Sequence, residues 1–582
     1  MRWTKPSLAV IATALLATSC SAGASNTGSG GAQARDTSPL TAALGTEKES
    51  AGPAPAVAGA RSGGTVNVYN STEFRHLDPQ KVYAGAAYSA SLLWGRQLTQ
   101  YQVVDGKAKL VGDLATDTGT SADGGRTWTY RLKEGVAWED GKPITSQDVK
   151  YGIERSFGKG YEVGPPYWPL WLTGEVSYEA ARAKYAGPQA GDLDAIQTPD
   201  ERTVVFHFPQ PQADVPYMAA QSSSSPVRRD KDTGTDYDRV PFATGPYRIA
   251  EHVQNTRMVL ERNPAWKAES DPIRNQYPDR FVFTYGREAL NINQQILSGR
   301  DGGADATVVS DVLSPELYQA ADTDPKAKEL VVSGRRGAYV TRLLINNDRV
   351  PDIAVRKALN LAYPRQQARQ VQGGSRTGEF ATTLSSPALV DWQKYDLYPA
   401  KPEGDPEAAK AELAKAAQPP ASLTYAYKNT PDGQRVAQVL VDGFGKAGIT
   451  VVPKPIDPKA FSDEVARADS PYDLYESTNS VDWPTPSTLI PFSFDGRTSA
   501  DFNETRYRNP EVDKEIDRIN QIGEPRAKAK ELYALEQKVM KDLPELPLYY
   551  PSVNQLRGSN LGGAFIHPIY GTVGLSWLYL KS

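Results

Sequence analysis

Hydrophobic and polar positions alternate in several short stretches of the chain from residue 63 onward, and this period of two predicts β-strands. The predicted strands cover residues 64–70, 127–132, 203–208, 244–249 and 342–347. Apolar residues at helical spacing predict α-helices at residues 86–98, 354–363, 407–417 and 525–543. Prolines keep residues 546–551 extended. Strands and helices are mixed without regular βαβ repetition, so the pattern predicts an α/β fold.

The N-terminus has the pattern of a secretory signal peptide over residues 1–20. Two basic residues precede an apolar run at 8–17, which is too short to span a bilayer, and small residues then lead to Cys20. Residues 17–20, Ala-Thr-Ser-Cys, resemble a bacterial lipobox, with Ala17 where leucine is commonest. The resemblance implies that Cys20, the only cysteine, is acylated and becomes the mature N-terminus. The alternative is a cleaved signal peptide with an incidental cysteine.

Residues 21–60 consist mostly of alanine, glycine, serine, threonine and proline. Such a segment lacks the large apolar side chains that offset the entropy of ordering, so we expect a flexible tether. A tether behind a lipidated Cys20 would hold the body at the outer face of the cell membrane. The remaining chain is too long for one hydrophobic core, which predicts two or three lobes.

Composition and charge narrow the function classes. The chain has 65 basic and 69 acidic residues, and its net charge of −4 gives no reason to expect a nucleic-acid partner. No metal site or cofactor is expected, because there is one cysteine and the four histidines are scattered: His76, His207, His252 and His567. A Ser-x-x-Lys match at residues 156–159 is short enough to arise by chance, and the chain has neither a Gly-x-Ser-x-Gly elbow nor a P-loop. We therefore do not expect an enzyme, and a secreted hydrolase is the rival class.

A series of motifs, in order along the chain, resembles family 5 of the bacterial extracellular solute-binding proteins, the peptide and nickel branch. The longest block begins with Asp113-Leu-Ala-Thr, continues through Asp-Gly-Gly-Arg-Thr-Trp-Thr-Tyr-Arg-Leu to Gly135, and is followed by Trp-Glu-Asp-Gly-Lys-Pro-Ile-Thr-Ser-Gln-Asp-Val at 138–149. The other matching segments are residues 77–79, 153–155, 244–247, 262–266, 346–359 and 507–510.

The resemblance implies a three-lobed fold like that of periplasmic binding proteins (type II, cluster C), with hinged lobes that close on a ligand. The implied lobe I consists of residues 61–97, 228–342 and 554–582, lobe II of 98–227, and lobe III of 343–553. It also implies a monomeric protein that captures di- to oligopeptides and delivers them to the permease and ATPase of an ABC importer. The same scaffold serves oligosaccharides, nickel chelates and haem, so a non-peptide solute remains an alternative.

The segment Ser480-Val-Asp482-Trp483-Pro resembles the family segment whose aspartate receives the ammonium group of the bound peptide. This assigns Asp482 to that role, since a cleft closed to water needs a carboxylate opposite an ammonium. The alternative is an aspartate that caps the following turn. The backbone of Thr478 and Ser480 matches the stretch that pairs with the peptide as an added strand. Trp483 either walls a side-chain pocket or packs the loop.

On the opposite lobe, Tyr83 and Gly85 match a family strand that touches the ligand backbone, although Tyr83 could equally be a core or hinge aromatic. The partner of the ligand carboxylate is not fixed by the resemblance. Arg369 and Arg376 flank a glycine-containing segment after a helix and are the candidates, with solvated arginines as the alternative.

Overall fold

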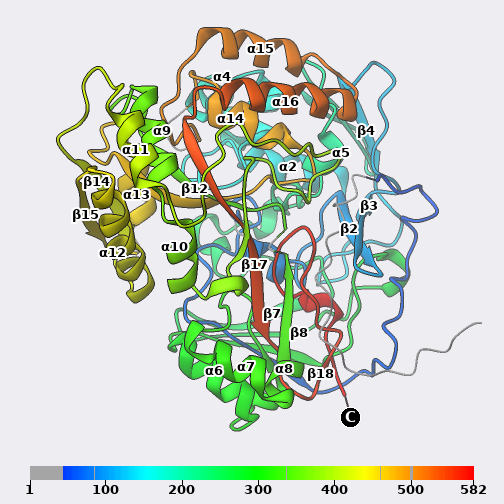
Figure 1. The fold of residues 1–582 in the computed structure, drawn as a ribbon. Helices are drawn as coiled ribbons and strands as arrows, with labels where there is room; N and C mark the ends of the chain where they lie inside the picture. The colour runs from blue at the N-terminus through cyan, green and yellow to red at the C-terminus, as the bar shows by residue number, and fades with distance from the viewer. Residues whose placement is uncertain (1–42, 84, 336, 459, 499–501, 582) are drawn as a thin grey trace, which may run out of the picture. The chain divides into compact units, whose positions relative to one another are not determined.

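The computed structural model describes residues 43–581 apart from 84, 336, 459 and 499–501. Within these residues the protein is a mixed α/β structure with several separate sheets, as the sequence pattern predicts (Figure 1). The first sheet is built from segments far apart in the sequence, in the order β10 (Ala306–Thr307), β1 (Thr65–Tyr69), β9 (Arg280–Thr284), β8 (Arg257–Arg262) and β7 (Tyr247–Val253). All five strands fall within the segments predicted to form lobe I.

Two smaller sheets lie within residues 98–227, the segment predicted to form lobe II. One is the hairpin of β2 (Thr99–Val104) and β3 (Lys107–Gly112). The other has the order β4 (Thr127–Arg131), β6 (Thr203–His207) and β5 (Ile196–Asp200). The predicted strands at 127–132 and 203–208 are therefore antiparallel neighbours.

The largest sheet has the order β11 (Val331–Arg335), β17 (Glu545–Leu556), β12 (Val340–Ile345), β16 (Leu474–Asn479), β14 (Leu423–Lys428) and β15 (Val451–Ile456), and β13 (Gly378–Phe380) also pairs with β17. The proposed lobe boundary at residue 342 falls inside β12, which pairs with β16 and β17. The long strand β17, red in Figure 1, pairs with β12 in its first half and with β11 in its second.

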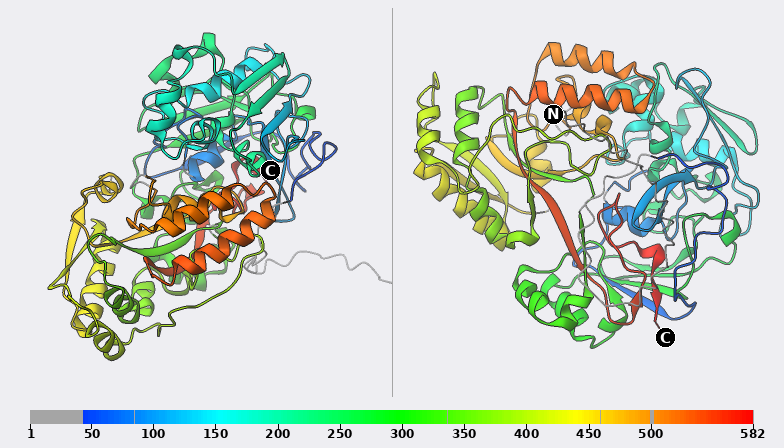
Figure 2. Two further views of the ribbon diagram at one scale, coloured as in Figure 1. Left: turned by 90° about the horizontal axis from the view of Figure 1, so that it is seen from above. Right: turned by 45° about the vertical axis from the view of Figure 1, so that its right-hand side comes forward.

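The first eight α-helices are α1 (Gly85–Ser91), α2 (Ser146–Arg155), α3 (Tyr167–Thr173), α4 (Tyr178–Lys184), α5 (Val215–Met218), α6 (Ala289–Ser298), α7 (Tyr318–Thr323) and α8 (Pro325–Leu330). The other eight are α9 (Ile353–Ala362), α10 (Arg365–Val371), α11 (Pro406–Leu413), α12 (Pro431–Lys446), α13 (Phe461–Ala466), α14 (Ile490–Phe494), α15 (Pro510–Asn520) and α16 (Pro525–Val539). The last two lie side by side in both views (Figure 2).

The helix predicted at 86–98 is shorter than expected, because α1 ends at Ser91. The carbonyl groups of Leu93 and Trp94 turn away to accept hydrogen bonds from the backbone N–H groups of Thr244, Gly245 and Tyr247, at 2.8–2.9 Å. These tertiary hydrogen bonds therefore occupy carbonyl groups that would pair within the helix if it were longer. The helix predicted at 407–417 is also shorter and ends at Leu413.

The motif at residues 138–149 forms a turn and the start of α2. Thr145 is the N-cap of this helix, and its hydroxyl accepts from the backbone N–H of Asp148 at 3.3 Å. Asp148 in turn accepts from the backbone N–H of Thr145 at 2.9 Å and from the indole N–H of Trp138 at 3.2 Å. This capping box satisfies N–H groups that a helix start leaves unpaired.

Two other motif segments meet through a buried ion pair. Asp78, from the Leu-Asp-Pro motif, lies 2.9 Å from the guanidinium of Arg155, at the end of the Ile-Glu-Arg motif. The side chain of Asp78 is fully buried and that of Arg155 is 2% exposed. Arg155 also contacts Asp232 at 2.8 Å. The pair joins α2 to the loop that follows β1.

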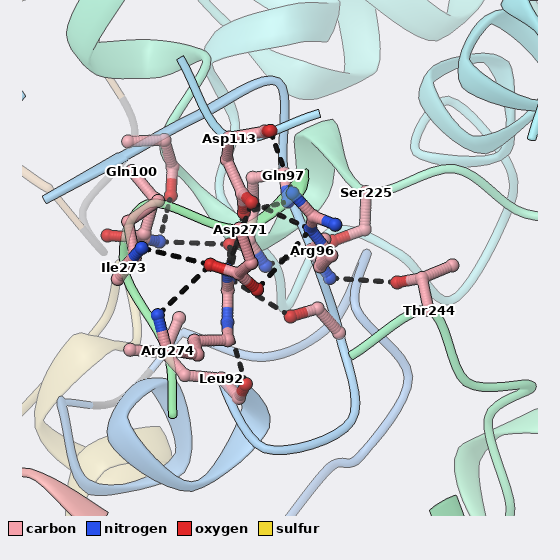
Figure 3. A network of polar contacts seen from close by, with 12 residues as sticks. Leu92, Arg96, Gln97, Gln100, Asp113, Ser225, Thr244, Asp271, Ile273 and Arg274 are labelled. Carbon is pink, nitrogen blue, oxygen red and sulfur yellow. Dashed lines mark hydrogen bonds and ion pairs between the residues drawn. The ribbon is translucent and has the colours of Figure 1, made fainter. Parts of the chain in front are cut away.

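A second buried network of charged groups joins β3 to the segment between β8 and β9 (Figure 3). Asp113 accepts from Arg96 and from Arg274, each at 2.8 Å, and Asp271 lies 3.3 Å from Arg274. All four side chains are at most 2% exposed. The two guanidinium groups hold the pKa of Asp271 well below its usual range although burial opposes this shift. The first residue of the longest family block is thus structural.

Residues 43–60 contact the body of the protein and do not form the flexible tether that the sequence predicts. Gly45 donates a 2.6 Å backbone hydrogen bond to Leu110, Glu49 forms an ion pair with Lys109, and the backbone N–H of Val57 donates to Tyr277. Low hydrophobicity did not prevent these contacts, because they are mostly polar and use backbone groups. The predicted signal peptide, Cys20 and the rest of the tether lie outside the described residues. In the part that is described, no helix is long and apolar enough to cross a membrane.

Candidate ligand-binding site

Asp482 lies in the loop that follows β16. Its backbone N–H donates to the hydroxyl of Thr488 at 2.9 Å, and its carbonyl accepts from the side-chain amide of Gln221 at 3.0 Å. The local contact comes from the Pro-Ser-Thr turn that follows, and the distant contact from residue 221 in the other half of the chain. Backbone contacts on both sides therefore fix the position of this aspartate.

The Asp482 carboxylate points at two tyrosines from the first half of the chain. Tyr83 donates its hydroxyl to Oδ2 at 2.9 Å, Tyr167 donates to the same oxygen, and the two hydroxyl oxygens are 3.3 Å apart. Burial raises the pKa of the Asp482 carboxyl to about 6, and the two hydrogen bonds partly oppose this rise. No ion pair involving Asp482 is found among the described residues.

This geometry differs from that of a turn-capping aspartate. A capping carboxylate accepts hydrogen bonds from the backbone N–H groups that follow it. Within residues 43–581 as described, the hydrogen bonds to the Asp482 carboxylate come from Tyr83 and Tyr167 instead. The carboxylate is thus held at a junction between distant segments, where the described part of the chain gives it no cationic partner.

Trp483 is buried next to this aspartate. Its side chain is 1% exposed, its ring centroid lies 4.7 Å from that of Tyr167 and 5.7 Å from that of Trp171, and its indole N–H donates to Ser487 at 3.0 Å. Trp483 belongs to the hydrophobic core formed mainly by residues 66–285, not to the core around β12 and β14. These contacts show that Trp483 packs in this core, and its role as the wall of a side-chain pocket stays a prediction.

Thr478 lies at the end of β16, and Ser480 comes directly after the strand. One edge of β16 pairs with β12 as far as Asn479. On the other edge, β14 pairs only with Leu474 and Tyr475. Residues 476–479 therefore present an edge without a strand partner among the described residues, and Thr478 is exposed there. A free strand edge can accept an extended peptide by main-chain hydrogen bonding.

Gly85 begins α1, two residues after Tyr83. A Cβ atom at this position would lie 2.7 Å from the carbonyl oxygen of Tyr570 and 3.3 Å from the hydroxyl of Tyr339. Close packing against the C-terminal segment is therefore sufficient reason for a glycine here. Its predicted contact with ligand backbone stays a prediction.

Arg369 and Arg376 both have partners in the structure. Arg369 lies over the ring of Phe380 at 4.1 Å and donates to the carbonyl of Gly378 at 3.4 Å. Arg376 forms an ion pair with Asp322 and donates to the side chain of Asn554 at 3.1 Å. These contacts bind both arginines to the protein itself, so neither is marked by geometry as the partner of a ligand carboxylate.

Sequence reasoning missed Tyr167 and Gln221, which contact the side chain and backbone of Asp482. A signal for Tyr167 is present in the aromatic and proline-rich segment Gly164-Pro-Pro-Tyr-Trp-Pro-Leu-Trp171, since so many rings in one segment indicate a packed junction. No comparable signal marks Gln221, which follows α5 and is 4% exposed.

Comparisons with known proteins agree with this architecture. The model of the family described as "Bacterial extracellular solute-binding proteins, family 5 Middle" matches residues 109–501. The chain is 25% identical over 451 residues to the probable D,D-dipeptide-binding periplasmic protein DdpA of Escherichia coli K12, covering 75% of this chain and 79% of that protein. It is 25% identical over 446 residues to the periplasmic oligopeptide-binding protein OppA of Salmonella typhimurium LT2, covering 73% and 76%.

Among solved structures, the clavulanic acid biosynthesis oligopeptide binding protein 2 superposes with a TM-score of 0.80 at 28% identity, covering 92% of this chain and 100% of that one. The family match extends over more than half of the sequence, and the structural match over nearly all of it. The chain therefore belongs to family 5 of the bacterial extracellular solute-binding proteins.

Proposed function

We propose that this protein is the extracytoplasmic solute-binding component of an ABC importer, that its ligands are peptides, and that it catalyses no reaction. The two curated relatives described above are named as dipeptide- and oligopeptide-binding proteins. In the proposed mechanism, lobes I and III close on the peptide, and the permease and its ATPase recognise the closed form.

The observation that carries the proposal is the half-buried Asp482, whose carboxylate has two hydroxyl donors and, among the described residues, no cationic partner. A carboxylate in a desolvated site is destabilised unless a positive charge lies beside it. The ammonium group of a peptide N-terminus supplies that charge together with three N–H donors. We infer that this group displaces or joins the tyrosine hydroxyls at Oδ2.

The free edge of β16 supports the same orientation of the ligand. With its ammonium at Asp482, an extended peptide would run back along Ser480 and Thr478 and pair with the backbone of β16. Main-chain pairing gives affinity that does not depend on peptide side chains. Tyr83 and Gly85 would face the ligand from the opposite side.

We also propose that Cys20 is acylated and anchors a monomer to the outer face of the cell membrane. The support is the lipobox-like sequence at residues 17–20. Two acyl chains give stable anchoring where one chain gives only marginal binding.

The test begins with native mass spectrometry of the freshly purified protein, to identify any solute that copurifies. Calorimetry then compares tetra-alanine with N-acetylated tetra-alanine. We expect the free peptide to bind at least tenfold more tightly, because acetylation removes the charge that pairs with Asp482. Equal affinities would contradict the role of Asp482, whereas a copurifying sugar or chelate and no peptide binding would overturn the peptide assignment.

A further inference from the structure

A cavity of about 990 Å³ opens where β14 and β16 separate. The two strands pair only at Tyr425 with Leu474 and at Ala426 with Tyr475, and beyond these pairs the cavity lies between their ends. The start of α12 and one side of α13 complete its lining. The cavity therefore adjoins the free edge of β16 to which the proposed function assigns the peptide backbone.

Glu476 is the charged residue of β16 that lines this cavity. The hydroxyl of Tyr363 donates a hydrogen bond to one of its carboxylate oxygens. Across the described part of the chain, no lysine, arginine or histidine forms an ion pair with Glu476. Burial raises the pKa of Glu476 to about 7, as expected for a carboxylate without a nearby positive charge.

Glu504 also lines the cavity, and it shares the guanidinium of Arg342 with Glu545. Arg342 lies 3.5 Å from Glu504 but donates two hydrogen bonds to Glu545, at 2.8 and 3.0 Å. The guanidinium of Arg506 donates to the backbone carbonyls of Val465 and Arg467, at 3.1 and 2.7 Å. One guanidinium thus serves two carboxylates, and burial raises the pKa of Glu504 to about 7.

The basic side chains that line the cavity are engaged elsewhere. Lys428 lies over the ring of Phe461 at 5.5 Å, and Arg467 forms a 2.8 Å ion pair with Asp469. No ion pair of Glu476 with these two side chains is found among the described residues, and Glu504 shares the guanidinium of Arg342 with Glu545. A positive group entering the cavity would find unmatched negative charge.

Aromatic rings give the cavity a second feature that suits a cation. Tyr425 and Tyr427 line it and stack with their ring centroids 6.1 Å apart and their planes at 13°. A guanidinium packs well on such faces, and its fork of N–H groups matches a carboxylate. Tyrosine rings and the Glu476 carboxylate, which has no ion-pair partner among the described residues, thus suit the apolar stem and the charged end of arginine, and those of lysine to a lesser extent.

From these observations we infer that the cavity between β14 and β16 is a specificity subsite for a basic side chain, arginine before lysine, of the bound peptide. The inference rests on the proposed function, because it takes the peptide to be held at Asp482 and along β16. At about 3.3 Å per residue, Glu476 lies about 13 Å along the strand from Ser480. Four residues of extended peptide cover this distance, so the side chain that enters the cavity is that of about the fifth residue of the peptide.

The test uses calorimetry with full-length protein and two peptides, Ala-Ala-Ala-Ala-Arg-Ala and the same peptide with citrulline in place of arginine. Citrulline keeps the length and planar end of arginine but carries no charge. We expect the arginine peptide to bind at least tenfold more tightly. Moving the arginine to the first position should remove most of this preference.

Variants locate the effect. Glu476→Gln and Glu504→Gln should each reduce the preference for arginine over citrulline at least threefold. Glu407→Gln, on the exposed surface of α11, should leave the preference unchanged.

The wild-type comparison does not depend on the folding of any variant. If the two peptides bind equally well to the wild-type protein, the subsite inference is wrong and the proposed function stands. If neither peptide binds, the proposed function fails and the inference fails with it.

Discussion

The hydroxyl oxygen of Tyr83 lies 2.9 Å from Oδ2 of Asp482, although 399 positions separate the two residues in the chain. The contact joins the segment before α1 to the loop after β16. It places a hydrogen-bond donor, but no positive charge, at the carboxylate that we assign to the peptide ammonium. A peptide would supply the missing charge at this point.

Replacement of this carboxylate should affect binding and stability in opposite directions. We expect Asp482→Asn to weaken the binding of tetra-alanine by about 2 kcal/mol or more, roughly 30-fold, because the ammonium would be buried without a counter-charge. The ligand-free variant should melt about 1 to 3 °C higher than the wild type, since a desolvated carboxylate is removed. Calorimetry and thermal melts measure the two effects, and Asp194→Asn, in an exposed loop before β5, is the control.

Peptide affinity should depend on pH with a midpoint near 6. Asp482 has a pKa of about 6 in the free fold, raised by burial, and a bound ammonium favours the ionised form. Affinity is therefore full above pH 6 and falls as the pH drops below it, by up to tenfold per unit. The ligand-free fold changes in the opposite sense and loses stability as the pH rises toward 6.

Two variants check the assignment of this midpoint. Tyr83→Phe removes a hydroxyl donor to the Asp482 carboxylate and should move the midpoint to higher pH. In Asp482→Asn, the midpoint near 6 should disappear. An unchanged midpoint in the asparagine variant would assign the titration to another group.

Gly85 offers a choice between packing and ligand contact. Gly85→Val would place a Cβ atom 2.7 Å from the carbonyl of Tyr570, so we expect a loss of unfolding free energy of about 1 to 3 kcal/mol in urea titrations. Gly445→Ala, in α12 with no atom within 4 Å of the new Cβ, should instead stabilise by up to about 1 kcal/mol. A Gly85→Val protein of normal stability that binds no peptide would favour ligand contact.

The buried network around Asp113 should be essential for folding stability. Arg274→Leu leaves Asp113 and Asp271 with less positive charge in a fully buried site, and we expect a loss of about 3 to 5 kcal/mol by chemical unfolding. Arg280→Leu is the matched surface control. Arg280 is 46% exposed and pairs with Glu261 at 2.9 Å, so its loss should cost less than about 1 kcal/mol.

Local patterns in the sequence predicted the strands β1, β4, β6 and β12 and the helices α9 and α16, because each has a clear hydrophobic period. Their pairing could not be predicted in the same way. The contacts of Asp78 with Arg155 and of Asp113 with Arg274 join segments 77 and 161 positions apart. Asp78, Arg155 and Asp113 stand inside the matching family motifs and Arg274 does not, and nothing in their local pattern indicates which acid meets which base.

The candidate site, too, could be predicted from the sequence only in part. Resemblance selected Asp482 and the backbone of Thr478 and Ser480 before it. The sequence did not show that β14 leaves the edge of β16 free after two residue pairs, nor that Tyr167 reaches the carboxylate. Those facts depend on where distant elements diverge or meet, which periodicity does not encode.

The burial of Trp483 in the core of the chain's first half affects how strongly the ligand-free and peptide-bound forms of the protein differ. Part of the apolar contact between the two halves is made by the protein's own side chains, so it favours the closed form whether or not a peptide is bound. An importer that recognised only the shape of the closed protein would then bind the ligand-free form as well as the peptide-bound form. The unmatched charge at Asp482 opposes this preference for the closed form, and the ammonium group of a bound peptide removes that opposition. Trp483 and Asp482, adjacent in sequence, would thus determine how often the importer engages a protein that carries no peptide.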